Sequence, residues 1–330
     1  MSSRYERTVQ FFDVDIVGRT YAHDLDEKHK RFASPRSLDD LMKEINVIRE
    51  LNKARKKAGK KSKYQFALED LTERKDCWVL LINLVDSDAA NLVTNRIDGS
   101  EADRQTIEFN EDQGLESSAH VVIFKEPNQL KKHLMLFEKS TNVPFQKASA
   151  FLNHLARVAA KHHKADYEMA HPSGDPSKKI NAYCRLNLFA HPSDEFKEEL
   201  TSGKLKEIRL TSDTVMLKGY DSAAQPELIG TEVKVNVSKA AVVFSGGNLK
   251  HLGKALQHAK DLDVPYVRVS FEDRTGTAHT AILSTDTGAL QNKDRYVKKR
   301  KIKNFRRALA TAVPVINDEI ANQMIELKND

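Results

Sequence analysis

The sequence predicts an α+β protein in which mixed or antiparallel sheets pack against helices in two subdomains. Apolar runs typical of buried strands, at residues 77–85 (CWVLLINLV) and 120–124 (HVVIF), alternate with segments whose apolar residues recur at helical spacing. The chain has 330 residues, enough for two ordinary cores. We place the boundary in the turn-rich segment 221–230, which gives an N-terminal α+β domain over residues 1–220 and a C-terminal α+β domain over residues 221–330.

The N-terminal domain has the clearest elements. Residues 9–17 combine aromatic and β-branched side chains and predict an opening strand. Ser37, followed by apolar residues at helical spacing, predicts a capped helix. The two apolar runs are expected to pair in one sheet. Pro127 can begin a helix that continues through Phe137, and residues 145–164 predict another helix.

Shorter elements are expected toward the C-terminus. The expected strands are residues 184–189, 204–210, 231–237, 240–244 and a hairpin of 264–271 with 279–283. The expected helices are a short one capped by Ser193, one over residues 248–260, and a long basic helix from Asp294 onward.

Composition indicates a cytoplasmic protein. The sequence has no apolar run near the roughly 18 residues that span a bilayer, and its N-terminus lacks the apolar core of a secretory signal. The only two cysteines, Cys77 and Cys184, form neither a disulfide framework nor a zinc-site pattern. No cofactor and no bound metal are expected.

The net charge of +6 is modest for this length, so the positions of the charged residues are more informative than their total.

The most concentrated charge lies in residues 293–307, where only Asp294 is acidic. The basic residues are Lys293, Arg295, Lys298, Lys299, Arg300, Lys301, Lys303, Arg306 and Arg307. On a helix these like charges repel one another at spacings of three and four residues, and a polyanion would relieve the repulsion. The run therefore predicts contact with the phosphate backbone of nucleic acid. The alternative is a solvated helix start, held to the core by Ile302, Phe305 and Leu309.

A second basic segment, residues 53–63, precedes the strand-like residues Tyr64 and Phe66. Its basic residues are Lys53, Arg55, Lys56, Lys57, Lys60, Lys61 and Lys63. The two aromatic residues could stack on bases of a single strand, although aromatic residues in strands more often belong to the core.

A secondary phosphate site is predicted where a strand is followed by two glycines and a helix. Its residues are Gly246, Gly247, Lys250 and Lys254. Asn248 as an ordinary N-cap is the simpler explanation.

No catalytic residue is expected. Asp221, Glu232 and Lys234 follow the order of acidic residues and lysine in metal-dependent nucleases, which makes a nuclease the alternative function. The same E-x-K pattern recurs at residues 326–328, and such matches arise by chance in a chain rich in Glu and Lys. None of the histidines has the spacing of a metal motif.

The order of elements resembles that of the RexA-like phage-exclusion proteins and the Kiwa-type antiphage DNA-binding proteins. The resemblance is carried by residues 78–93 (WVLLINLVDSDAANLV), 117–124 (SSAHVVIF), the helix pair after them, 267–283 (VRVSFEDRTGTAHTAIL) and the terminal ANQMIEL. It implies a homodimer that binds DNA with little sequence preference and acts in phage exclusion or antiphage defence with a membrane-protein partner. It assigns no active-site residue. A protein-binding adaptor of a defence complex is a further alternative.

Overall fold

The chain folds into two compact units that alternate along the sequence. The computed structural model describes residues 5–22, 25, 30–57, 63–96, 103–110, 113–129, 131–140, 142–171, 175, 177–212, 231–235, 247–262, 264, 266–273, 275–285, 290–291 and 296–330. Unit 1 comprises Met1–Gln10, Val14–Leu188 and Arg300–Asp330, and unit 2 comprises Phe11–Asp13 and Phe189–Lys299. These bounds differ from the predicted domains 1–220 and 221–330, because the C-terminal segment belongs to unit 1. The predicted boundary at 221–230 lies outside the described residues.

Unit 1 is built on an antiparallel sheet, so the predicted α+β class is confirmed. The strand order is β11 (Lys179–Ala190), β1 (Glu6–Thr20), β9 (His133–Lys139), β8 (Leu115–Pro127), β5 (Cys77–Asp86), β4 (Tyr64–Glu73) and β3 (Arg55–Lys57). β2 (Arg31–Ala33) and β17 (Lys299–Lys303) also pair with β1, β10 (Glu168–Ala170) pairs with β11, and β6 (Leu92–Thr94) pairs with β7 (Gln105–Ile107). The two predicted apolar strands pair as β5 and β8, with Leu80 opposite Val121. This pairing forms the centre of the core.

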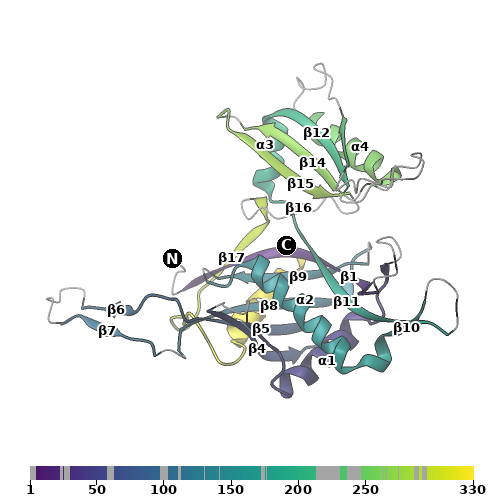
Figure 1. The fold of residues 1–330 in the computed structure, drawn as a ribbon. Helices are drawn as coiled ribbons and strands as arrows, with labels where there is room; N and C mark the ends of the chain where they lie inside the picture. Colours follow the sequence, from purple (N-terminus) through teal and green to yellow (C-terminus); the bar gives the residue numbers. More distant parts are fainter. Residues whose placement is uncertain are drawn as a thin grey trace. The chain divides into compact units, whose positions relative to one another are not determined.

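Helices cover the sheet of unit 1 on both faces (Figure 1). α1 (Leu38–Glu50) begins at the predicted cap, where the Ser37 hydroxyl accepts a hydrogen bond from the Asp40 N–H. It packs with α2 (Phe145–His162), which is followed by the short helix η2 (Lys164–Tyr167). Trp78 on β5 faces these helices, since its Nε1 donates to Asp39 Oδ1 at 2.7 Å. Asn83, five residues further along the strand, faces the opposite side, where it donates to the Val313 carbonyl oxygen at 3.1 Å.

The helix predicted from Pro127 to Phe137 is wrong. Residues 133–139 instead form β9, whose Leu136 lies opposite Val122 of β8. Met135, Leu136 and Phe137 are all buried. Consecutive buried residues fit a strand covered on both faces as well as a buried helix, and only the neighbouring strand distinguishes the two.

The long basic helix predicted at the C-terminus is also wrong. Lys299–Lys303 form strand β17, and the terminal helix is only α5 (Asp318–Glu326), extended by η5 (Leu327–Asn329). A strand turns successive side chains to opposite faces, which separates the like charges that a helix would crowd together. Asn304, at φ 63°, then turns the chain after β17.

Unit 2 contains a smaller antiparallel sheet. Its strand order is β13 (Thr231–Val235), β12 (Lys204–Ser212), β14 (Tyr266–Glu272), β15 (Ala278–Ser284) and β16 (Leu290–Gln291), with helices α3 (Asp194–Ser202) and α4 (Gly247–Asp261). The predicted hairpin is confirmed as β14 and β15, and Ser193 caps α3. The expected strand at 240–244 lies outside the described residues.

In the part of the chain that the structure describes, no helix is long and apolar enough to span a bilayer.

A buried carboxylate connects the middle strands of unit 1. Glu138 on β9 accepts hydrogen bonds from Arg7 Nε at 2.8 Å and from the backbone N–H of His120 at 3.0 Å. His120 Nε2 accepts the N–H of Asn317 at 2.9 Å, so the ring proton sits on Nδ1 and is donated to Glu138 at 2.6 Å. Burial raises the pKa of Glu138, but the hydrogen bonds of His120 and the charge of Arg7 outweigh burial and hold it below its usual value.

We expect Glu138→Gln to lower the free energy of unfolding by about 3–5 kcal/mol, because the substitution removes the buried negative charge that lies 2.8 Å from Arg7 Nε. Urea unfolding at pH 7 measures this loss. In the wild type, the ionised form of Glu138 stabilises the fold above the carboxyl's unfolded pKa of about 4.3, and this contribution is lost as the pH falls through the lower folded pKa. The variant should lack this acid-dependent loss.

The control is Glu126→Gln, at an exposed carboxylate that pairs with Lys328 on the surface. Its cost should stay within about 0.5 kcal/mol. Equal costs for the two variants would contradict the role of Glu138.

Candidate nucleic-acid interface

The basic run at the C-terminus is divided between the units. Lys298 and Lys299 belong to unit 2, and Arg300, Lys301, Lys303, Arg306 and Arg307 belong to unit 1. Residues 292–295, which include Lys293 and Arg295, lie outside the described residues. Ile302 and Phe305 are buried, as predicted for residues that anchor the run, and Leu309 is half-buried. The anchoring is therefore confirmed, although the segment is a strand.

Exposed cations follow from this anchoring. Because Ile302 points inward, its neighbours Lys301 and Lys303 point outward on the opposite face, about 6.6 Å apart along the strand. Arg306 and Arg307 are exposed in the turn that follows. The side chains of Lys303, Arg306 and Arg307 make no ion pair with another described residue. We call Lys301, Lys303, Arg306 and Arg307 the β17 cations.

Some of the charge is paired at the surface. Lys301 Nζ lies 2.9 Å from Glu6, and Arg300 Nε lies 3.2 Å from Asp330. The hydrogen bond from Lys301 lowers the pKa of Glu6. Exposed pairs of this kind contribute at most about 1 kcal/mol, so a polyanion can compete for these cations.

The second basic segment lies at the far edge of the same sheet. Arg55, Lys56 and Lys57 form β3, which pairs with β4, and Lys60 and Lys61 lie outside the described residues. Lys53, Arg55, Lys57 and Lys63 are exposed, although Arg55 lies 3.6 Å from Glu69 and Lys63 contacts Asp88. Phe66 is buried, which makes it part of the core, and Tyr64 is half-buried beneath Lys147. Phe66 is therefore not available for stacking on bases.

The two basic segments do not form one patch. β17 pairs with β1, and β9, β8, β5 and β4 separate β1 from β3. At about 4.8 Å per strand, β1 and β3 lie about 24 Å apart along the sheet. A small anion cannot touch both segments.

The other predicted sites lie partly outside the described residues. Glu232 and Lys234 are two residues apart on β13, so their backbone positions share one face, opposite Thr211 and Arg209 of β12. Asp221, their predicted partner, lies outside the described residues. Of the secondary phosphate candidates, Gly247 and Lys250 lie in the first turn of α4 and Lys254 is exposed, while Gly246 lies outside the described residues.

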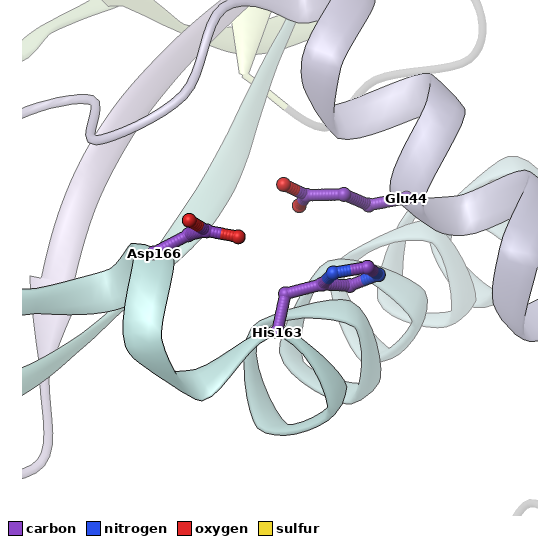
Figure 2. A group of neighbouring side chains, drawn as sticks. All are labelled: Glu44, His163 and Asp166. Carbon is purple, nitrogen blue, oxygen red and sulfur yellow. The ribbon is translucent and has the colours of Figure 1, made fainter.

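A cluster of possible metal ligands lies where α1 meets the end of α2. One ligand atom each from Glu44, His163 and Asp166 lies within 4.8 Å of the others, and Figure 2 shows the three side chains converging. One Glu44 oxygen accepts the Tyr167 hydroxyl at 2.5 Å, and the other forms an ion pair with Arg36, whose Nε lies 2.6 Å away without hydrogen-bond geometry. A cation bound here would have to displace the Arg36 guanidinium, so the cluster forms a polar contact between the helices rather than an open metal site.

Sequence reasoning missed both this cluster and a group of cations beside it. Arg157 and Lys161 are four residues apart on α2, and Lys164 follows on η2. The four-residue spacing was a signal that the two side chains share one face of the helix. Tyr21, just after β1, and Tyr183 on β11 lie beside these cations in the folded chain. Tyr21 is more than 100 residues away from them in the sequence, and no local pattern connects it with them.

Comparisons with known proteins place the chain in no family. No family model matches it, and neither a curated protein nor a solved structure matches it.

Neither cysteine is positioned as a nucleophile. Cys77 and Cys184 are both buried, and burial raises the pKa of both thiols. We expect the native protein to react with Ellman's reagent at pH 8 at least roughly a hundredfold more slowly than the urea-unfolded protein, because attack requires local opening. Rapid reaction of one thiol in the native state would contradict this, and Cys184→Ser would show which thiol reacts.

Proposed function

We propose that this protein binds the phosphate backbone of DNA with little sequence preference, and that the β17 cations make the central contact. The observation that carries the proposal is the exposure of Lys301, Lys303, Arg306 and Arg307 around the buried anchors Ile302 and Phe305. The anchors hold the backbone of the cations in place. Binding then orders only the ends of the side chains, which costs less conformational entropy than ordering a free basic tail.

Repulsion among the cations of the basic run does not by itself require a polyanion in the folded chain. On a helix, the run would need an anion to relieve its repulsion, but the strand already separates its charges. Two features of the folded chain support the proposal: the outward row of cations, and the weak surface pairs that a phosphate can replace. Each phosphate that is neutralised also releases condensed counterions, which favours binding at low salt.

The basic residues of β3 provide a second contact in this proposal. A duplex has one base pair per about 3.4 Å, so it would cover the roughly 24 Å between β1 and β3 in about seven base pairs. Lysines on edge strands also protect the sheet against pairing with another chain, which gives β3 and β17 a structural role beside binding. None of these residues forms a pattern that reads bases, in agreement with the proposed lack of sequence preference.

The cellular role that we propose follows from the resemblance to phage-exclusion and antiphage proteins. In this role the protein acts as a homodimer on DNA, together with a membrane-protein partner. Plaque assays on cells that carry the wild type or a DNA-binding variant would test the role, and equal plating efficiency with and without the wild type would contradict it.

We expect affinity for a labelled 20-base-pair duplex to fall steeply between 50 and 200 mM salt in fluorescence anisotropy. The double variant Lys303→Glu, Arg307→Glu should bind at least tenfold more weakly. It should also lower the slope of log affinity against log salt by about 2, because two phosphate contacts are lost. Both side chains are exposed, so the variant should unfold like the wild type.

The matched control is Lys43→Glu, Lys75→Glu, which changes the net charge equally at two exposed positions, on α1 and in the turn between β4 and β5. Its affinity should stay within about twofold of the wild type. Equal losses in both variants would indicate a general effect of net charge, and salt-independent binding or no binding would overturn the proposal.

A further inference from the structure

A pocket of about 260 Å³ lies in unit 1 between α2, η2, β11 and the end of β1. Its walls combine three tyrosines with three cations. They are Tyr21, Tyr167, Tyr183, Arg157, Lys161 and Lys164. Among the described residues, no carboxylate lines it, and we call it the tyrosine pocket.

The pairing of β1 with β11 places the aromatic wall. Thr20, the last residue of β1, donates its hydroxyl to the carbonyl oxygen of Asn181 at 2.8 Å. The next residue, Tyr21, therefore stacks on Tyr183, with ring centroids 4.6 Å apart and an angle of 21° between the planes. Tyr21 remains 54% exposed, so much of its surface is available to a ligand.

A clamp between α2 and β11 places the cationic wall. Asn153 donates to the carbonyl oxygen of Leu186 and accepts its N–H, both at 2.9 Å. Arg157 and Lys161 follow at four-residue steps on the same side of the helix. Arg157 uses Nε to donate to the Asn153 carbonyl oxygen, which leaves its two terminal nitrogens without a hydrogen bond to a described residue.

The third tyrosine adds no charge to the pocket. Tyr167 is buried and donates its hydroxyl to Glu44 at 2.5 Å. Burial raises the pKa of Tyr167, so its phenol stays neutral. The net charge of the pocket walls is therefore positive and comes from Arg157, Lys161 and Lys164.

We propose that the tyrosine pocket binds one nucleotide, with its base stacked on Tyr21 and its phosphate held by Arg157, Lys161 and Lys164. Stacking on tyrosine accepts any base, and arginine and lysine are the usual phosphate ligands. The volume lies just under the roughly 300–1,000 Å³ of ordinary small-molecule sites, which suits a mononucleotide rather than a dinucleotide. The nucleotide can be free or part of a single strand.

This site is separate from the β17 cations. Lys301 contacts Glu6 at the start of β1, and the pocket lies beyond Thr20 at its end. These ends are about 46 Å apart along the strand, so a mononucleotide cannot touch both. Binding of a mononucleotide can therefore be measured whether or not the protein binds duplex DNA.

Isothermal titration calorimetry on the full chain tests the proposal with AMP, adenosine and inorganic phosphate as probes. AMP should bind at least tenfold more tightly than adenosine or phosphate, because only AMP supplies both the base and the charge. Tyr21→Ala should weaken AMP binding roughly 5- to 100-fold, since it removes the stacking surface. Lys161→Gln should weaken AMP binding and leave adenosine binding unchanged.

The matched controls are Tyr5→Ala, at a tyrosine of similar exposure, and Lys75→Gln. Both should bind AMP like the wild type.

A five-nucleotide single strand shows whether the natural ligand is a free nucleotide or part of a strand. If the strand binds at least tenfold more tightly than AMP and Tyr21→Ala abolishes this binding, the ligand is a strand. If the strand and AMP bind equally well, the ligand is a free nucleotide. No AMP binding at millimolar concentration, phosphate binding as tight as AMP binding, or no effect of Tyr21→Ala would overturn the proposal.

Discussion

The fold of unit 1 depends on one buried carboxylate. Glu138 brings together Arg7 near the start of the chain and His120 in the middle of the sheet, and His120 in turn accepts the N–H of Asn317, the N-cap of α5. Arg7 also donates to the carbonyl oxygen of Ala310 at 2.9 Å. Because a buried charge must be paired, these groups specify one arrangement of the first strand, the central strands and the C-terminal segment.

The segment between β17 and α5 has no regular structure because polar groups of the sheet take the place of its own hydrogen bonds. The Ser118 hydroxyl accepts the N–H of Val313 at 2.9 Å, and Asp70 accepts the N–H of Ile316 at 3.1 Å. The backbone N–H of Ser118 donates to the carbonyl oxygen of Thr311. A segment held in this way keeps β17 against β1, and this is why the cations of unit 1 have a defined position.

Cations occur in two different settings in unit 1, and the two settings suit different ligands. On β17 and β3 they stand at exposed positions along strands, which suits a repeating anion such as a phosphate backbone. At the tyrosine pocket three cations lie beside stacked aromatic rings in one concave site, which suits a single ligand with both a planar and an anionic part.

The sequence by itself determined the elements whose signals are local. Ser37 and Ser193 cap helices where predicted, and the apolar run at 77–85 is the central strand. The exposed basic residues and the buried anchors Ile302 and Phe305 could also be read from the sequence. Only the tertiary structure decided that residues 133–139 and 299–303 are strands, since a strand forms where a neighbour accepts its backbone hydrogen bonds. The tyrosine pocket likewise exists only in the folded chain. The pairing of β1 with β11 brings Tyr21 beside residues more than 100 positions away in the sequence, and the Asn153 clamp holds α2 against β11.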